Sequence, residues 1–564
     1  MQQTKNIERT RAQESTNAIE KLYISMRHLF SRGFYKPMGV SGETLRKSLL
    51  LLRPEIYGSI AEERLELDGL IYVIERLPKG IEECQFINLT ADEGYKNSHF
   101  ETIIPPKRRR NCYRIDKDQM NIEITRGRSE IYDILTHLTF LFIESHKIQE
   151  RVSLNEGEDY IREWKHLEDV VLHQKKISEK EIAVLIVHLG NILGRTFDEV
   201  SRIYKVFKTE ENPNRFFNII FWLGKLAINE IEENKKRTVT FSSVLIEEIG
   251  HHIYGEIWAN NIKHILKEHN LLQRPIHIIS ANMHSVMNSI YAKGALPAES
   301  KEYKDFELFQ LLSNSDSKPL QKKVKDYASE NGLIYVKDTS GTNINVQIID
   351  TEKINFDVSS FKKANSISAN SISENSVLIV MDYAFGEQAY ETMDELLKPY
   401  HTDNEKVHLD VKSVSIMGKA GILEGGKGDI MIPDAHIFEG TADNYPFKNE
   451  LTKENLEGFG VQVFDGTMIS VLGTSLQNKD LLKFFHDSTW NVIGLEMEGA
   501  HYQKAIQSAS KIRGNISEDV KVRYAYYASD NPLETGATLA SGGLGMTGVT
   551  PTYAITQRIL EQIF

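Results

Sequence analysis

Short apolar, β-rich runs alternate with helical patterns through the second half of the chain. The runs cover residues 276–279, 377–380, 411–416, 468–471, 492–493 and 524–526. Alternation of this kind is typical of α/β domains, in which helices connect the strands of a sheet and pack on its faces. The sequence therefore predicts an α/β domain with a largely central sheet.

The first half of the chain is dominated by helical patterns. Apolar residues recur at helical spacing from Ile19 to Phe30 and again from Ile131 to Phe142, where Ser129 is a candidate helix cap. Further helices are expected over residues 181–193, 214–233 and 243–268, and a strand over residues 70–73. Because the character changes close to residue 273, we expect a mainly α-helical domain over residues 1–270 and the α/β domain over residues 271–564.

The composition limits which functions are open to the chain. Its 564 residues, 41% of them hydrophobic, are enough for two domains with real cores. The formal net charge is -12, and a general binder of nucleic acid or of anionic membranes needs a broad positive field, so neither is an expected partner. Two cysteines and the lack of a membrane-length apolar run predict a cytoplasmic protein without disulfides.

Two segments depart from the domain pattern. The basic run over residues 107–110, Lys-Arg-Arg-Arg, follows two prolines and predicts a solvated surface turn. The alternative is a docking point for an anionic regulator such as a nucleotide. The segment 359–376 is rich in Ser and Asn and poor in core-forming residues, so we expect a mobile insertion there.

Two carboxylates follow one of the apolar runs. Glu496 and Glu498 flank Met497 directly after the run that contains residues 492–493. Buried charge is costly and is normally retained where something uses it, so we expect one of the two carboxylates to face a ligand. A later run also ends in polar groups, Ser529 and Asp530.

These acidic motifs belong to an ordered series. Gly418 and Gly421 have the spacing Gly-x-x-Gly, Gly-Asp-Ile follows at residues 428–430, and Glu-Met-Glu and Ser-Asp come after it. In this order the motifs resemble those of the nucleoside phosphorylase and nucleosidase superfamily. The resemblance covers the C-terminal half and implies a phosphorylase-like α/β/α domain with a central mixed sheet. Residues 278–284 are similar to the superfamily's first strand, and residues 383–389 to its Gly-rich turn.

One branch of this superfamily is the nearest match. Residues 529–533, Ser-Asp-Asn-Pro-Leu, are similar to the Ser-Asp-x-Pro-Leu of the AMP nucleosidases, in which an extra domain also precedes the catalytic one. The resemblance implies an N-glycosidase that hydrolyses AMP or a related adenine nucleotide to base and ribose phosphate. It implies a small-molecule purine nucleotide or nucleoside as partner, no cofactor, no metal and, by analogy, a homo-oligomer.

The resemblance also assigns roles to individual residues. Asp530 would donate a proton to N7 of the leaving base. Glu498 would accept hydrogen bonds from the ribose hydroxyls and stabilise the positive charge that develops on the sugar. The other residues implied in substrate binding are Met497, Glu496, Lys419, Gly418, Leu476 and Ser529.

Several departures from the superfamily pattern concern the nucleophile and the base. His284 stands near the position where nucleosidases place a water-activating glutamate, and it is the substitute base; a structural histidine bonded to backbone is the alternative. Lys419 stands where Ser or Thr is usual, and it could bind a 5′-phosphate or a nucleophilic phosphate. Leu476 replaces the aromatic residue that stacks on the base, and Tyr526 replaces a common arginine.

The sequence is compatible with three alternative functions. The first is a phosphate-dependent purine nucleoside phosphorylase with Lys419 as the phosphate ligand. The second is a non-catalytic nucleotide-sensing protein on the same fold, because the water-activating acid is missing. The third is a metal site in the helical half, for which satisfied or exposed histidines are the commoner explanation. Its candidate ligands are His137, Glu144, His146, Glu248 and His251.

Overall fold

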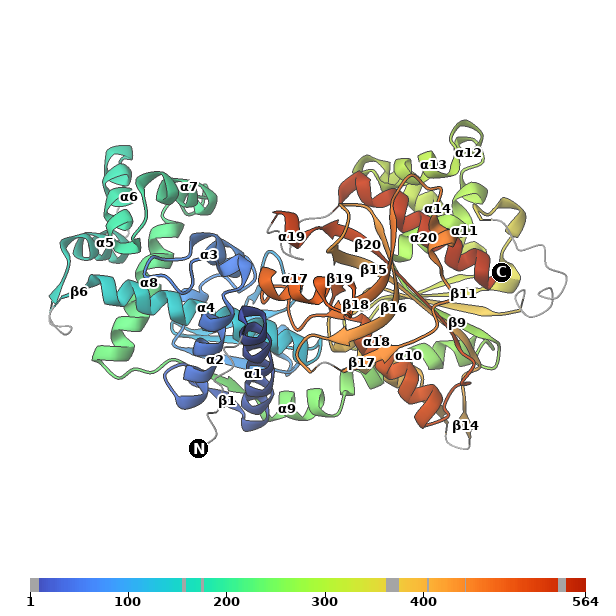
Figure 1. The fold of residues 1–564 in the computed structure, drawn as a ribbon, viewed down its shortest axis with the longest axis horizontal. Coiled ribbons are helices and arrows are strands. Elements are labelled where there is room, and N and C mark those ends of the chain that lie inside the picture. The colour runs from blue at the N-terminus through green and yellow to red at the C-terminus, as the bar shows by residue number, and fades with distance from the viewer. Residues whose placement is uncertain are drawn as a thin grey trace, which may run out of the picture. The chain divides into compact units, whose positions relative to one another are not determined.

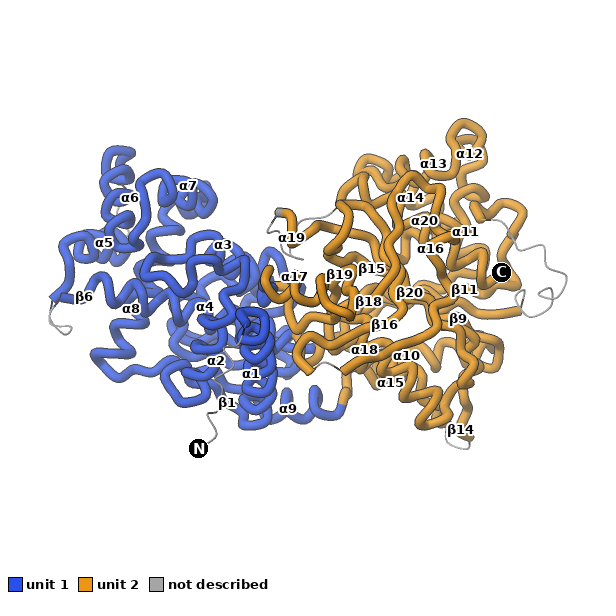
Figure 2. The backbone as a smooth tube through the Cα atoms, in the orientation of Figure 1, with its two compact units in different colours: residues 1–125, 130–251, 475–478 blue, residues 126–129, 252–474, 479–564 orange. Residues whose placement is uncertain are grey.

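The computed structural model describes residues 10–154, 159–173, 177–361, 375–402, 405–441, 443–535 and 544–564. This part of the chain forms two compact units (Figure 2). Unit 1 consists of Met1–Thr125, Glu130–His251 and Ser475–Asn478, and unit 2 of Arg126–Ser129, His252–Thr474 and Lys479–Phe564. Most of the insertion predicted to be mobile, residues 362–374, lies outside the described residues.

Unit 1 is rich in helices, as its apolar periodicity predicts (Figure 1). The first helix begins at a capping box between Thr10 and Gln13 and ends at Gly33, whose φ of 83° is left-handed. The helices are α1 (Arg11–Arg32), α2 (Val40–Leu52), α3 (Leu67–Ile74), α4 (Arg128–Val152), α5 (Arg162–Leu172), α6 (Glu179–Leu193), α7 (Phe197–Phe207), α8 (Arg215–Glu232) and α9 (Ser243–Gly250). Across the described ranges of the whole chain, helices long and apolar enough to cross a bilayer are absent.

A mixed sheet accompanies these helices, and the sequence did not predict it. Its order is β1-β8-β2-β5-β4-β3. The strands are β1 (Phe34–Tyr35), β2 (Phe86–Thr90), β3 (Thr102–Ile103), β4 (Cys112–Asp116), β5 (Gln119–Glu123) and β8 (Thr238–Phe241); β6 (Ser153–Leu154) and β7 (Asp159–Tyr160) form a separate pair. The strand predicted over residues 70–73 is wrong, because these residues lie in α3, where Glu66 accepts hydrogen bonds from the first-turn N–H groups of Asp68 and Gly69.

The boundary between the units lies at His251 and His252 rather than near residue 270. The helix predicted over residues 243–268 is in fact two helices, α9 and α10 (Ile253–Glu268), which are separated at His252, whose φ is 58°. Side chains of α10, including Trp258 and Leu266, are part of a core cluster of unit 2. Helix α10 therefore belongs to unit 2.

Unit 2 is built on a ten-stranded mixed sheet, so the predicted α/β class is confirmed. The strand order is β10-β11-β12-β9-β15-β19-β18-β16-β17, and β20 pairs with both β15 and β16. The strands are β9 (Ile276–Ser280), β10 (Leu333–Val336), β11 (Val346–Asp350), β12 (Val377–Met381), β15 (Val411–Ile422), β16 (Ile430–Phe438), β17 (Asn444–Pro446), β18 (Val463–Ser470), β19 (Val492–Glu496) and β20 (Lys521–Asp530). A separate pair consists of β13 (Tyr400–His401) and β14 (Lys406–Val407).

Helices cover both faces of this sheet (Figure 1). Along β12, Val377 and Ile379 belong to one core cluster and Leu378 and Val380 to the other, as the alternation of side chains along a strand requires. The first cluster includes side chains of α10, α15 (Gln388–Leu396) and α18 (Gly499–Gln507). The second includes side chains of α11 (Met283–Ala295), α13 (Asp305–Ser313), α14 (Lys318–Glu330), α16 (Lys453–Leu456) and α20 (Val549–Ile563). The remaining short helices are α12 (Glu299–Glu302), α17 (Lys479–Asp487) and α19 (Pro532–Thr535).

Five strands of the sheet close into a ring. Strand β15 pairs with β19, β19 with β18, β18 with β16, β16 with β20, and β20 again with β15. The β15–β20, β18–β19 and β16–β18 pairs are parallel. Because neighbouring parallel strands end at the same edge, the polar residues that follow β18 and β19 are brought together there.

Candidate active site

The Glu-Met-Glu segment lies where β19 ends and α18 begins. The buried carboxylate of Glu496 accepts hydrogen bonds from the hydroxyl of Ser470 and from the backbone N–H groups of Glu498 and Gly499. Burial raises the pKa of Glu496 to about 7 in spite of these donors. The bonds make Glu496 a cap for the start of α18, and the substrate contact implied for it stays a prediction.

Glu498 lies beside the turn that follows β12. Its Oε1 accepts a hydrogen bond of 2.8 Å from the backbone N–H of Gly386, and its Oε2 accepts one of 3.3 Å from the N–H of Met497. The side chain of Met497 is buried next to the same glycine. Burial, followed by the nearby charge of Glu496, raises the pKa of Glu498 to about 8. Glu498 is only half-buried, so it is open to a ligand.

A short N-terminal segment of unit 2 supports this turn. Ser129 Oγ accepts a hydrogen bond of 2.8 Å from the backbone N–H of Glu387, and Arg128 Nη1 lies 2.9 Å from Glu387 Oε1. Gly386 has a φ of 56°, and a Cβ at this position would lie 2.4 Å from Ser129 Oγ. Ser129, the candidate helix cap, lies inside α4 and instead holds the turn that contacts Glu498.

Asp530 ends the strand on the other side of β15. Gly421 is in register with Leu495 of β19 and with Asp530 of β20. The hydroxyl of Ser529 lies 3.0 Å from the carbonyl oxygen of Ala420 and also donates to Asp530 Oδ1. The strand ends that carry Asp530 and the Glu-Met-Glu segment therefore flank the same glycine.

His284 and Lys419 lie on one pocket of about 410 Å³ in unit 2. Both side chains are exposed, and His284 is the second residue of α11. The other lining residues are Asn282, Ser285, Met287, Asn288, Leu312, Ser313, Gln321, Tyr527, Leu544, Gly545, Gly548, Val549, Thr552 and Tyr553. Since none of these lining residues is an Asp or Glu, the charge that the pocket carries comes from Lys419.

A tyrosine connects the pocket to the turn beside Glu498. The hydroxyl of Tyr383 lies 3.3 Å from that of Tyr527, which lines the pocket and is in register with Lys419. Gly386, three residues after Tyr383, contacts Glu498. The structure thus brings His284 and Lys419 together on the pocket, while Glu498 lies at the turn and is not among the residues that line the pocket.

The remaining predicted residues lie in different surroundings. Gly418 is in register with Tyr526, whose hydroxyl lies 3.0 Å from Nε2 of the buried His436. Burial lowers the pKa of His436 to about 3, so the tyrosine contacts a neutral imidazole. Leu476 is buried in the segment Ser475–Asn478 of unit 1, so the base contact implied for it stays a prediction.

Sequence reasoning missed a third buried carboxylate at this edge of the sheet. Glu439 follows β16, and its Oε2 accepts a hydrogen bond of 3.2 Å from the backbone N–H of Leu472. Its own N–H donates to the carbonyl oxygen of Ser470, 3.1 Å away. Burial raises the pKa of Glu439 to about 7. The signal was a single acid directly after an apolar run, which is the pattern that singled out Glu496.

The histidines and glutamates proposed as metal ligands in unit 1 have separate partners. His146 Nε2 lies 3.3 Å from Glu230, whereas Glu144 pairs with Lys147 at 2.8 Å. Within the described ranges, no group of three or more His, Cys, Asp or Glu side chains is placed to hold a metal ion.

The sequence model of a family of unknown function, DUF6909, matches residues 43–306 and 297–564 of the chain. The chain belongs to this family. The DUF6909 match includes residues of both units.

Solved structures similar to this DUF6909 chain cover about half of it. A Campylobacter jejuni 5′-methylthioadenosine/S-adenosylhomocysteine nucleosidase is 11% identical, covers 51% of this chain and 99% of its own, and has a TM-score of 0.30. For a Helicobacter pylori futalosine hydrolase the identity is 12%, the coverages are 51% and 99%, and the TM-score is 0.29. A Streptococcus pneumoniae MTA/SAH nucleosidase in complex with 8-aminoadenine is 11% identical, covers 51% of this chain and 99% of its own, and has a TM-score of 0.29. No curated protein matches the sequence.

Proposed function

We propose that unit 2 cleaves the N-glycosidic bond of a purine nucleotide, with AMP or a related adenine nucleotide as the substrate and water as the nucleophile. The observation that carries this proposal is the register of Gly421 with both Leu495 and Asp530. Neighbouring strands lie about 4.8 Å apart, so the two flanking strand ends are roughly 10 Å apart, a span that a bound nucleoside can bridge. Glu498 and Asp530 then face opposite ends of the scissile bond.

Glu498 is suited to stabilise the sugar. Cleavage of the glycosidic bond develops positive charge on the ribose. Burial disfavours the ionised form of a carboxyl group. It also reduces the screening by solvent, so a positive charge that arises beside the group attracts the carboxylate more strongly than it would in water. The raised pKa of Glu498, about 8, therefore supports a role in which the developing ribose cation favours its ionised form.

Asp530 supplies the acid on the base side. In this proposal its protonated carboxyl donates to N7 of the purine, so that the base leaves as a neutral molecule. The neighbouring Ser529 hydroxyl donates to Asp530 Oδ1 and orients the carboxyl group. Asp530 is 8% exposed, so its carboxyl group is largely shielded from solvent.

The pocket with Lys419 and His284 takes the 5′-phosphate in this proposal. Lys419 contributes a positive charge, and none of the other lining residues contributes a carboxylate that would repel the anion. The pocket also contains the start of α11, whose backbone N–H groups favour negative charge.

Release of adenine from AMP and from adenosine, measured with and without inorganic phosphate, tests the proposal. We expect release from AMP that does not depend on added phosphate, with a lower KM than for adenosine. Glu498→Gln and Asp530→Asn should each lower kcat by about 100- to 1,000-fold. Asp519→Asn, at an exposed position just before β20, is the matched control and should retain full activity. Wild-type kinetics in both site variants would overturn the assignment.

A phosphate-dependent phosphorylase is the second candidate, and the pocket itself favours it. Lys419 could hold a nucleophilic phosphate there, whereas hydrolysis needs a base to take the proton of water, and among the lining residues His284 is the candidate for that role. The same assay separates the two reactions, because phosphorolysis needs added phosphate and yields a sugar 1-phosphate. Adenine-nucleotide binding without any base release, unchanged in Asp530→Asn, would instead indicate a non-catalytic nucleotide sensor.

A further inference from the structure

Three arginines gather on one side of α4 in unit 1. Arg108 makes two hydrogen bonds of 2.9 Å to the carboxylate of Asp133, and Arg110 Nη2 makes a third of the same length. Arg76 stacks on the ring of Tyr72, with its Cζ 3.5 Å from the ring centre. The solvated turn predicted for the basic run is therefore wrong for Arg108 and Arg110, which are drawn inward by an acidic residue of α4.

The carboxylates beside these arginines are distributed unevenly. Glu130 lies 3.2 Å from Arg110 Nε, so Asp133 and Glu130 together offset two of the three positive charges. Arg76 is 6% exposed, and its counterion Glu75 is 4.0 Å away, with a side chain that is 39% exposed. A buried guanidinium is stabilised little by a distant, solvated counterion, so an anion beside Arg76 would be favoured.

Several buried donors of the cluster point to the same conclusion. Among the described residues, Arg76 Nε and Arg110 Nη1 have no hydrogen-bond partner, and neither ring nitrogen of His137 has one. Arg110 is 5% exposed and His137 fully buried. Burial lowers the pKa of His137 to about 3, so its ring is neutral. A buried polar group without a partner is destabilising, and a bound acceptor would relieve this for each donor that it pairs with.

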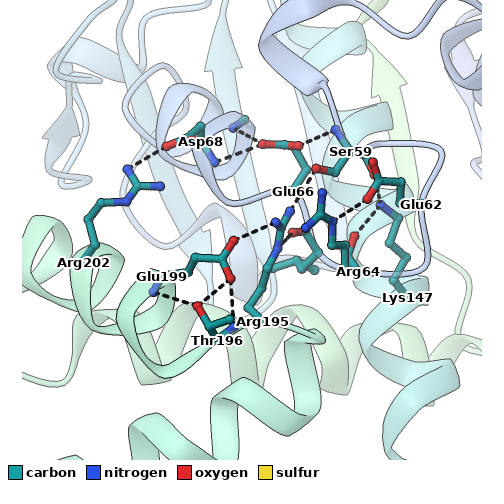
Figure 3. Close-up of polar contacts among 12 residues, drawn as sticks. Ser59, Glu62, Arg64, Glu66, Asp68, Lys147, Arg195, Thr196, Glu199 and Arg202 are labelled. Carbon is teal, nitrogen blue, oxygen red and sulfur yellow. Dashed lines mark hydrogen bonds and ion pairs between the residues drawn. The ribbon is translucent and has the colours of Figure 1, made fainter.

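The unpaired groups lie close to one another. His137 Nδ1 is 3.7 Å from Asp133 Oδ2, and the His137 ring is 5.7 Å from that of Tyr72, on which Arg76 stacks. All three arginines act electrostatically on His137. Elsewhere in unit 1 an arginine of similar burial is fully satisfied: Arg195 donates to Ser59, Glu199 and a backbone carbonyl (Figure 3). Arg46 Nε of unit 1 is also unpaired, so what distinguishes this cluster is that several unpaired nitrogens lie close together.

We propose that unit 1 binds a phosphate group at the cluster of Arg76, Arg110 and His137. Water could accept the free hydrogen bonds but would leave Arg76 with only its distant counterion. An oxyanion satisfies both, and guanidinium groups match phosphate oxygens in geometry. The phosphate can come from inorganic phosphate or from a nucleotide, and the two sources share the chemistry that this cluster recognises.

Calorimetric titration of the full-length Lys419→Met variant with inorganic phosphate, and separately with AMP, tests the site. The Lys419 substitution removes the charge of the unit 2 pocket, and the part of the remaining binding that is lost when Arg76 or Arg110 is replaced reports on unit 1. We expect binding of at least one of the two ligands, weakened at least 10-fold by adding Arg76→Gln or Arg110→Gln. If AMP binds more tightly, the preferred ligand of the site is a nucleotide phosphate. If inorganic phosphate binds more tightly, the preferred ligand is the free anion.

Arg202→Gln in the same background is the matched control. Arg202 pairs with Asp68 at the surface of unit 1 (Figure 3), so its loss removes one charge without touching the cluster and should leave binding unchanged. Circular dichroism checks folding of each variant, and Arg76→Gln is the milder change because it leaves Asp133 fully paired. Absence of saturable binding in Lys419→Met, or binding equal in the Arg76, Arg110 and Arg202 variants, overturns the proposal.

Discussion

The backbone N–H of Gly386 donates a hydrogen bond of 2.8 Å to Oε1 of Glu498. This bond favours the ionised carboxylate and opposes the rise in the pKa of Glu498 that burial causes. Its geometry depends on the turn around Gly386, which Ser129 holds through the N–H of Glu387. The protonation of Glu498 is therefore linked to a serine that is distant in sequence.

Replacing Ser129 with alanine should loosen this turn. The backbone N–H of Glu387 would lose its acceptor, a cost of about 1 kcal/mol, and the bond from Gly386 to Glu498 would weaken. We expect kcat to fall by about 3- to 10-fold and the pH profile of kcat to shift to higher pH, because the pKa of Glu498 rises further. Ser329→Ala removes an exposed helix serine of unit 2 and should leave the profile unchanged. A loss of thermal stability without any shift of the profile would show a purely structural role.

The stability of unit 2 should depend on the ionisation of Glu498. Its pKa is raised from 4.5 to about 8, so between these values the folded state retains a proton that the unfolded chain releases. Stability contributed by the neutral form is therefore present at low pH and is lost as the pH rises. Glu498→Gln should melt at a higher temperature than the wild type at pH 8, with the difference shrinking toward pH 5. Thermal unfolding across this range measures it, and a constant difference would contradict the shift.

Removal of the Glu496 side chain should be much more damaging than removal of an exposed acid. Glu496→Ala leaves the N–H groups of Glu498 and Gly499 and the hydroxyl of Ser470 without their acceptor. Because buried unpaired groups are costly, we expect a loss of about 3 kcal/mol or more in unfolding free energy. Denaturant unfolding should show this loss, whereas Glu424→Ala, at an exposed position of unit 2, should change it little.

The first residue of α18 should tolerate no side chain. A Cβ at Gly499 would lie 2.4 Å from the ring of His436 and 2.5 Å from the hydroxyl of Tyr526. Gly499→Ala should therefore destabilise the protein by about 1–3 kcal/mol, since both neighbours are buried. Gly250 in α9 has nothing within 4 Å of the same position, so Gly250→Ala should be neutral or slightly stabilising. Equal melting temperatures for the two variants would show that the site around Gly499 can relax.

The strands of unit 2 and the helices of unit 1 were largely predictable because their apolar patterns are strong. The run at residues 276–279, for example, is part of β9, and the periodic segment from Ile131 lies in α4. The sheet of unit 1 was missed because β2 and β5 are short and carry polar residues such as Asn88 and Asn121 between their apolar ones. Such strands depend on neighbours that are distant in sequence.

The positions of two candidate residues relative to the strands were predictable for a similar reason. Glu498 and Asp530 follow apolar runs, and this position relative to a strand can be recognised in a sequence. The contacts of Gly386 and Ser129 cannot, because Gly386 and Glu498 are 112 positions apart, Ser129 and Glu387 are 258 apart, and both contacts depend on tertiary packing. The basic run was misjudged because Asp133, which draws two of its arginines inward, lies more than 20 residues away.

The closed ring of five strands restricts how this site can diversify. A residue inserted into β15 would shift the alternation of its side chains and disrupt the ladders to both β19 and β20. Insertions and deletions are therefore expected to be tolerated in the loops that connect the strands of the ring rather than in the strands themselves. Substitutions in the turns after β12 and β18 are expected to alter ligand binding without moving the strand ends that carry Glu498 and Asp530.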